Sequence, residues 1–350
     1  MYNEMFTLAL AVIIAVLFSW AFRALPKENW QVLACLPTRK GQDGMWQGIN
    51  LTYYGFFNAL AYLFAVVMFL IMMGSQNIRV ADTILLAVPF LAICMLASRL
   101  IARLVEKKRF TFSVGGASFA GILIAPWITL LVNMILGETL GFHLPVLKTL
   151  SAIFIAYAFG EGTGRLACIS FGCCYGKPVA VCHPLIQRIF HKWNLVFWGK
   201  TKKISYAQQL EGQAVVPIQA LTAVIYTGVG LLSFYLFLNG FSNAALIITL
   251  MVTQLWRFAS EFLRADYRGH GLISVYQIMT LIAICYTLVI VTLIKEPDYA
   301  SPNLLNGVIS LWNPGIIVFL VILWGVSFVW AGKSSVTCSS INIQIVEKNI

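Results

Sequence analysis

The stretch FGEGTGRLACISFGCCYGKP, residues 159–178, is the most unusual part of this chain because it ends a long apolar run. It holds an acid, an arginine, three cysteines and five glycines. The apolar run reaches back to residue 149, and a helix that crosses a bilayer needs about 20 such residues. What an arginine does at this position depends on the surrounding chain.

The composition is that of a membrane protein. Of the 350 residues, 60% are hydrophobic and 11% are charged, and the mean hydropathy is +0.84. We therefore predict an all-α polytopic membrane protein, a bundle of about nine transmembrane helices. The first span lacks a basic flank and a cleavage site, so we predict a membrane helix rather than a signal peptide that is removed. The nine spans lie at about 5–24, 51–73, 82–102, 114–136, 149–173, 216–238, 243–263, 272–294 and 314–332.

The net charge of +11 does not indicate a nucleic-acid partner. Membrane proteins carry Lys and Arg beside their helices as topology signals, and a basic surface also suits anionic phospholipid headgroups.

Three arginines fall within or at the ends of the spans: Arg99, Arg165 and Arg257. A cation in hydrocarbon costs at least about 2.5–3.5 kcal/mol, so each needs a reason. Arg99 lies near a basic helix end, where it either snorkels to the interface or binds substrate. Arg165 and Arg257 each have an acid four residues away, Glu161 and Glu261, so each can pair on one helix face. Two such pairs predict a polar cavity, and the planar guanidinium suits the phosphate of a phospholipid.

The glycines and cysteines around Arg165 fit this reading. Gly164, Gly172 and Gly176 let backbone or substrate approach closely. A metal site built from Cys168, Cys173, Cys174, Cys182 and His183 matches no standard zinc spacing. We therefore predict free thiols that pack helices, and no metal or other cofactor. Attack by Cys173 or Cys174 to form a covalent intermediate is a further alternative.

Several motifs, taken in order, resemble the prolipoprotein diacylglyceryl transferase family over residues 50–294. The segment TGRLACISFGCCYGK resembles its signature, with Gly164, Arg165, Gly172 and Gly176 at the signature positions. The other matching segments are NLTYYGFFNALAY with Tyr54 and Gly55, ASRL with Arg99, GGASFAG with Gly115, Gly116 and Ser118, VPIQALTA with Gln219, WRFASEFLRADYRG with Arg257, Glu261 and Arg264, and GLISVYQIMTL.

The resemblance implies an activity: transfer of a diacylglyceryl group from phosphatidylglycerol, or another anionic phospholipid, to the lipobox cysteine of a prolipoprotein. It implies a multi-pass protein of the bacterial plasma (inner) membrane whose partners are the lipid and prolipoprotein signal peptides. The expected catalytic residues are Arg165, Arg257 and Glu161. The expected substrate-binding residues are Arg99, Tyr54, Gly115, Gly116, Ser118, Gly164, Gln219, Glu261 and Arg264.

The resemblance also suggests a domain organisation. Residues 51–294 form the transferase-like core of seven helices, with a polar cap at 174–215. Residues 1–50 add an N-terminal transmembrane helix and a Trp-rich interfacial segment, and residues 295–350 add a C-terminal transmembrane helix and a tail.

The sequence departs from the family pattern at its polar positions. Ala120 replaces the family's histidine, and Val216, Leu221 and Thr222 replace its histidine, tyrosine and glutamate. Either Glu161 then serves as the proton acceptor or the chemistry differs from that of the family. The alternative is a non-catalytic protein of the same fold that binds or moves phospholipid.

Charge and resemblance disagree on orientation. With the N-terminus outside, 18 of the 24 basic residues lie on the cytoplasmic side, against Arg79, Lys148 and Lys295 on the other side. The positive-inside rule thus predicts a cytoplasmic cap, whereas the resemblance implies that the cap faces outward. Basic residues at an outer rim are explained by attraction to anionic headgroups, so we expect the cap and the C-terminus outside and the N-terminus inside. The 18 residues lie in 22–50, 103–113, 174–215, 264–271 and 333–350.

Overall fold

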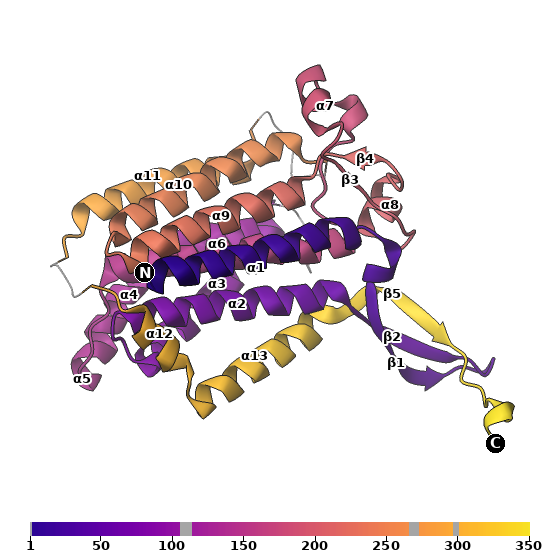
Figure 1. Ribbon diagram of the computed structural model, residues 1–350, viewed down its shortest axis with the longest axis horizontal. Coiled ribbons are helices and arrows are strands. Elements are labelled where there is room, and N and C mark those ends of the chain that lie inside the picture. The colour runs from indigo at the N-terminus through magenta and orange to yellow at the C-terminus, as the bar shows by residue number, and fades with distance from the viewer. Residues whose placement is uncertain (1, 106–113, 266–272, 297–300) are drawn as a thin grey trace.

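The computed structural model describes residues 2–105, 114–265, 273–296 and 301–350, and within these it is a helical bundle (Figure 1). Parts of the expected segments 103–113, 264–271 and 272–294 lie outside the described residues. Nine long helices run along the bundle, as predicted. Their bounds are α1 Tyr2–Ala24, α2 Tyr53–Ser75, α3 Val80–Val105, α4 Val114–Val132, α6 Val146–Phe171, α9 Ile218–Leu238, α10 Ser242–Ser260, α11 Val275–Leu293 and α13 Pro314–Gly332.

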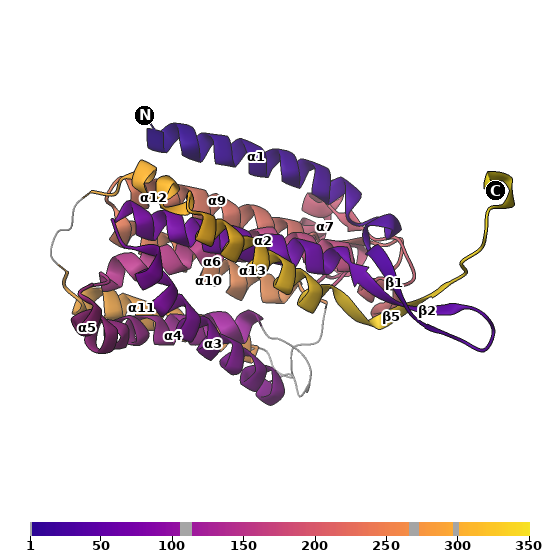
Figure 2. The same cartoon turned by 90° about the horizontal axis from the view of Figure 1, so that it is seen from below.

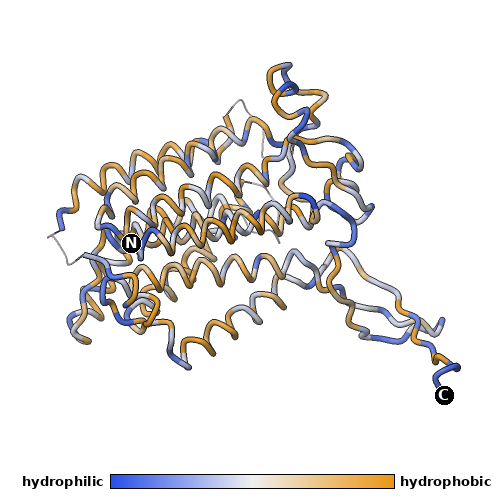
Figure 3. The backbone as a smooth tube through the Cα atoms, in the orientation of Figure 1, coloured by the Kyte–Doolittle hydropathy of each residue, from blue (hydrophilic) through white to orange (hydrophobic). Residues whose placement is uncertain are grey.

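Eight helices among the described residues are long and apolar enough to cross a membrane. The remaining long helix, α6, has 26 residues but carries Lys148, Glu161 and Arg165. It packs against α2, α9 and α10, and the Glu161 and Arg165 side chains are only 10% and 12% exposed. Hydrophobic residues run along the helices, and hydrophilic ones gather at the bundle ends and in the cap (Figure 3). The chain is thus a polytopic membrane bundle.

Small residues set the closest helix contacts, as is common where helices pack in membranes. A Cβ on Gly162 would lie 2.7 Å from the Thr227 side chain on α9. A Cβ on Gly55 would lie 2.1 Å from the Gly332 backbone, so α13 crosses the start of α2 at a glycine pair. The extra C-terminal helix α13 is therefore packed against the bundle through α2.

A three-stranded antiparallel sheet, in the order β1-β2-β5, projects from one end of the bundle (Figures 1 and 2). Its strands are β1 Val32–Lys40, β2 Trp46–Thr52 and β5 Lys333–Ile341. The sequence reading, which assigned an interfacial segment and a tail to these residues, did not predict them. Strands β2 and β5 are almost 300 residues apart along the chain, and they pair antiparallel with Ile49 opposite Cys338. Neither segment alone therefore predicts the sheet.

The cap lies at the end of the bundle where α6 stops and α9 starts. Lys202 holds it in place. This buried side chain donates from Nζ to the carbonyl of Ser170 at 2.6 Å and to that of Leu25 at 3.2 Å. The N-terminus lies at the opposite end from the cap and the C-terminus (Figure 1). The cap contains η3 Val179–Val181, α7 Pro184–Phe190, β3 Leu195–Val196, α8 Lys203–Gln208 and β4 Ala214–Val215.

Short elements complete the described chain: η1 Glu28–Trp30, the π-helical turn η2 Asn133–Gly137, α5 Glu138–Leu140, η4 Glu261–Leu263, α12 Leu304–Leu311 and η5 Glu347–Asn349.

Candidate functional site

One face of α6 carries a row of polar side chains. Tyr157, Glu161, Arg165 and Cys168 follow one another at four, four and three residues, so they lie along a single helix face. Arg165 forms the expected ion pair with Glu161, and both side chains are almost buried, at 12% and 10% exposure. Arg165 Nη1 also lies 4.0 Å from Cys168 Sγ. The Arg165 Nε is buried and has no hydrogen-bond partner among the described residues.

Arg257, near the end of α10, has two hydroxyl groups as its closest partners. Its Nη1 donates to the Tyr157 hydroxyl at 2.9 Å and to Ser118 Oγ on α4 at 3.1 Å. Glu261 makes no ion pair with it among the described residues, because α10 ends at Ser260 and Glu261 starts a 3₁₀ turn. The described residues thus show no close Glu261–Arg257 contact, although the Glu261 charge acts on the guanidinium. A tyrosine and a serine hold the guanidinium instead.

Gly115 lets Arg257 come this close to α4. A Cβ at that position would lie 2.8 Å from the ring of buried Tyr276 and 3.2 Å from Arg257 Nη2. Gly116 serves a different contact, because its Cβ would lie 2.8 Å from Ile101 on α3. Gly115 thus gives room to the Arg257 guanidinium, and Gly116 gives room to the neighbouring helix α3.

The two arginines belong to one polar region. Both guanidinium groups interact electrostatically with the buried Tyr226 of α9. The Tyr226 hydroxyl donates to the Thr253 carbonyl of α10 at 3.0 Å, and its ring contacts that of Tyr157. Helices α6, α9 and α10 therefore place two largely buried cations within electrostatic range of Tyr226.

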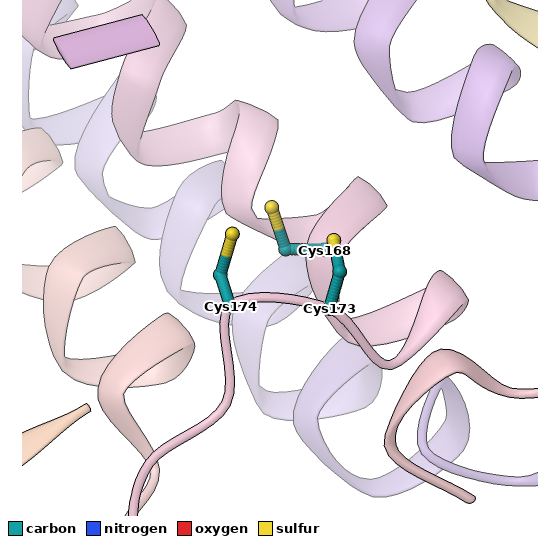
Figure 4. Close-up of side chains that lie close together, drawn as sticks. All are labelled: Cys168, Cys173 and Cys174. Carbon is teal, nitrogen blue, oxygen red and sulfur yellow. The ribbon is translucent and has the colours of Figure 1, made fainter. Parts of the chain in front are cut away.

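The turn after α6 gathers three cysteines (Figure 4). Gly172, at φ +70°, ends the helix in the left-handed conformation, and the Cys173 amide donates back to the Cys168 carbonyl at 3.0 Å. This is the Schellman arrangement, which folds the residue after the glycine onto the helix's last turn. Cys174, at φ +57°, continues the reversal. The sulfur atoms of Cys168, Cys173 and Cys174 all lie within 4.8 Å of one another.

Neighbouring segments hold this turn in place. Gly176 pairs with Arg264, and a Cβ on Gly176 would lie 2.4 Å from the Val216 carbonyl oxygen. Buried Gln219 of α9 donates from Nε2 to the Cys173 carbonyl at 2.9 Å, and its Oε1 has no partner among the described residues. The expected residues Gln219 and Arg264 therefore lie beside the signature turn.

Cationic side chains also affect the thiols. Hydrogen bonding with Cys168 and Cys173, aided by the charges of Arg264 and Arg165, outweighs burial and lowers the pKa of the Cys174 thiol well below its ordinary value. Hydrogen bonding and burial raise the pKa of the Cys173 thiol. A cysteine placed in this way favours the thiolate, which is the form that reacts and binds metals.

The remaining expected residues occupy mixed positions. Tyr54 packs on Phe171 and interacts electrostatically with the three cysteines, so it borders the site. A Cβ on Gly164 would lie 3.6 Å from Ala61, an ordinary contact, so close packing does not require this glycine. Arg99 lies on an exposed face of α3. Tyr157 and Tyr226 were missed, although Tyr157 precedes Glu161 by four residues and could have been found from that spacing.

The positions that depart from the family pattern are integrated into the packing. Ala120 is half-buried on α4. Thr222, at the place of the family's glutamate, accepts a hydrogen bond from Trp256 Nε1 at 2.9 Å. Cys182 and His183 lie apart from the sulfur cluster, since Cys182 bonds the Pro178 carbonyl and His183 caps α7.

Comparison with known proteins agrees with this geometry. No curated protein matches the chain. A family model described as prolipoprotein diacylglyceryl transferase matches residues 45–293, which include α2 through α11 and all the site residues described above. Because the match covers well over half of the chain, this multi-pass membrane protein belongs to the prolipoprotein diacylglyceryl transferase family, a family of transferases.

Proposed function

We propose that the chain transfers a diacylglyceryl group from phosphatidylglycerol to the cysteine thiol of a lipobox-type peptide or a related acceptor. The observation that carries the proposal is the pair of largely buried arginines, Arg165 and Arg257, which both act electrostatically on buried Tyr226. A cation inside a membrane bundle is costly unless it meets an anion. Arg165 has Glu161, whereas the closest partners of Arg257 are two hydroxyl groups. A phospholipid phosphate supplies an anion at the depth of the helix ends.

The reaction divides into steps that these residues can support. The acceptor sulfur attacks the glyceryl carbon that bears the phosphate, a carbon–sulfur bond forms, and the carbon–oxygen bond to phosphate breaks. Negative charge then grows on the departing glycerol phosphate, where Arg165 and Arg257 stabilise it. The thiol proton passes to Glu161, the carboxylate nearest to Arg165, because thiolate is the nucleophile.

The alternative is a phospholipid-binding protein without turnover, and Ala120 favours it. The family's histidine is absent at this position, and the structure places no histidine among the described polar residues of α6 and α10. If Glu161 does not accept the proton, the same cationic region would hold the lipid and release nothing.

We place the protein in a bacterial plasma membrane with the cap and the C-terminus outside and the N-terminus inside. The cap and the C-terminus lie at the opposite end of the bundle from the N-terminus (Figure 1), so one choice of side sets all three. Prolipoproteins reach a transferase from the outer face, so a site beneath an outward cap would meet them directly.

The test compares variants of purified protein in lipid nanodiscs that contain labelled phosphatidylglycerol, with retained lipid and released glycerol phosphate measured separately. Removing one charge-stabilising donor typically lowers turnover by about 10²–10³, so Arg165→Ala and Arg257→Ala should each lose at least that. Arg188→Ala is the matched control, because Arg188 is exposed on α7. Full activity in either alanine variant would remove the assigned role, and retention without release in the wild type would establish the binding-only alternative.

A further inference from the structure

The three thiols at the end of α6 form a ligand set that the proposed reaction leaves unused. Their sulfur atoms lie within 4.8 Å of one another (Figure 4). Tetrahedral zinc with Zn–S bonds of about 2.3 Å holds its sulfur ligands about 3.8 Å apart. The set therefore needs to contract by no more than about 1 Å to bind such an ion, a change within reach of side-chain rotation.

The backbone holds the three residues in this arrangement. The Schellman turn folds Cys173 onto Cys168, and Gln219 fixes the Cys173 carbonyl from α9. Cys174 adopts a left-handed φ of +57°, which costs a non-glycine residue of order 1–3 kcal/mol. That conformation directs the third thiol to the other two, and preformed ligands reduce the cost of binding a metal.

Charge balance suits a metal–thiolate centre. Three thiolates and one Zn²⁺ carry one net negative charge, and a fourth thiolate would add another. Arg165 Nη1 lies 4.0 Å from Cys168 Sγ, and the Arg264 guanidinium acts electrostatically on Cys174. Donors placed in this way orient the ligands and stabilise their charge.

We propose that Cys168, Cys173 and Cys174 bind zinc and leave the fourth coordination position open to the acceptor thiol. Three protein ligands with one open position are the pattern of catalytic zinc, and thiolate ligands are among those that select zinc. The proposal replaces the expectation of no metal, which rested on spacing along the chain alone. It deepens the proposed diacylglyceryl transfer and rests on it.

Zinc would supply what the replaced histidine does not. A thiol that coordinates zinc is deprotonated, and its proton leaves to Glu161 or to solvent. The bound sulfur then attacks the glyceryl carbon, the carbon–oxygen bond to phosphate breaks, and the uncharged thioether dissociates as a weak ligand. Cys173 is buried, whereas Cys168 and Cys174 are half-buried, so an acceptor can reach the centre from one side.

Metal content tests the site without reference to activity. The full chain is purified under reducing conditions without a metal-affinity step, and zinc is measured by elemental analysis. We expect one zinc ion per chain, lost in Cys168→Ser, Cys173→Ser and Cys174→Ser but retained in Cys285→Ser, whose cysteine is exposed on α11. Cobalt added to the metal-free wild type should produce a thiolate charge-transfer band, and a short cysteine peptide should then change the visible spectrum as it takes the fourth position.

The outcomes separate this inference from the proposed function. Zinc that is absent from the wild type, or that survives all three serine substitutions, overturns the site, and so does a disulfide among the three cysteines. If the serine variants misfold, the cobalt titration still tests the site, because it uses the wild-type protein. A thioether product formed at full rate in metal-free protein refutes the zinc centre and leaves the transferase standing. A bound zinc with no thioether product refutes the transferase alone.

Discussion

Replacing Arg257 with lysine tests the guanidinium clamp, because the substitution keeps the positive charge and removes the fork. Arg257 Nη1 is already engaged by Ser118 and Tyr157, which leaves Nη2 and Nε as donors for a lipid phosphate. The lysine ammonium carries all its donors on one atom. It therefore cannot reproduce the spread of the guanidinium fork, and we expect at least one of these hydrogen bonds to be lost.

The size of the loss follows from the number of bonds given up. A hydrogen bond to a charged group is worth about 1.5–3 kcal/mol, and each 1.4 kcal/mol or so of transition-state stabilisation is about tenfold in rate. Losing one bond predicts a fall in kcat/KM of roughly tenfold to a hundredfold for Arg257→Lys. Arg257→Ala should fall further, since the charge goes as well.

The assay measures initial rates of glycerol phosphate release from labelled phosphatidylglycerol in detergent micelles or nanodiscs, with a lipobox peptide as acceptor. Arg188→Lys is the matched control at an exposed position of the same end of the bundle. Retention of phosphatidylglycerol, measured by native mass spectrometry, gives a reading that does not depend on turnover.

A double-mutant cycle identifies how Tyr157 acts. If its hydroxyl only positions Arg257, Tyr157→Phe should lower kcat/KM by itself and add little to Arg257→Lys, because the two changes break the same contact. Independent, additive losses would give Tyr157 another role. Activity of Arg257→Lys within about twofold of the wild type would refute the clamp.

Three further predictions test the acid, the cap and the orientation. Glu161→Gln should stop thioether formation, followed by peptide mass, while phosphatidylglycerol stays bound; normal turnover would make Glu161 only a structural partner of Arg165. Burial lowers the pKa of Lys202 to about 8. Below that pH the lysine is charged in both the folded and the unfolded chain. Between about pH 8 and about pH 10.4 only the unfolded chain keeps the proton. Thermal stability in detergent should therefore rise from about pH 8 to about pH 10, by up to roughly 3 kcal/mol, and Lys202→Met should flatten the rise; an equal rise in both proteins would contradict it. A single cysteine placed in 192–212, in a background without other exposed thiols, should react with a membrane-impermeant reagent on intact cells; protection until the cells are opened would place the cap in the cytoplasm and rule out an emerging prolipoprotein as acceptor.

The membrane helices could be predicted from sequence because hydropathy and length are local properties. The predicted span at 314–332 coincides with α13, and the others end within a few residues of their helices. The β1-β2-β5 sheet could not be predicted in this way. Its partners at Trp46–Thr52 and Lys333–Ile341 come from opposite ends of the chain, and each is too short and too mixed to signal a strand alone.

The candidate site shows the same division between local and distant signals. The pair Glu161–Arg165 follows from helical spacing on one element. The partners of Arg257 do not, because Ser118 and Tyr157 come from two other helices and no spacing on α10 points to them. The cysteine cluster had a local signal that was missed: a glycine between Cys168 and Cys173 is the Schellman pattern, which brings those two side chains together although zinc spacings do not include them.

The central claim is that this bundle makes a thioether from phosphatidylglycerol. The most direct measurement incubates the purified wild type with phosphatidylglycerol labelled in its glyceryl carbons and a lipobox peptide, then weighs the peptide and quantifies glycerol phosphate. We predict a peptide that gains the labelled diacylglyceryl mass at its cysteine, one glycerol phosphate for each modified peptide, and no product with Arg165→Ala. An unmodified peptide beside tightly retained lipid would contradict the claim.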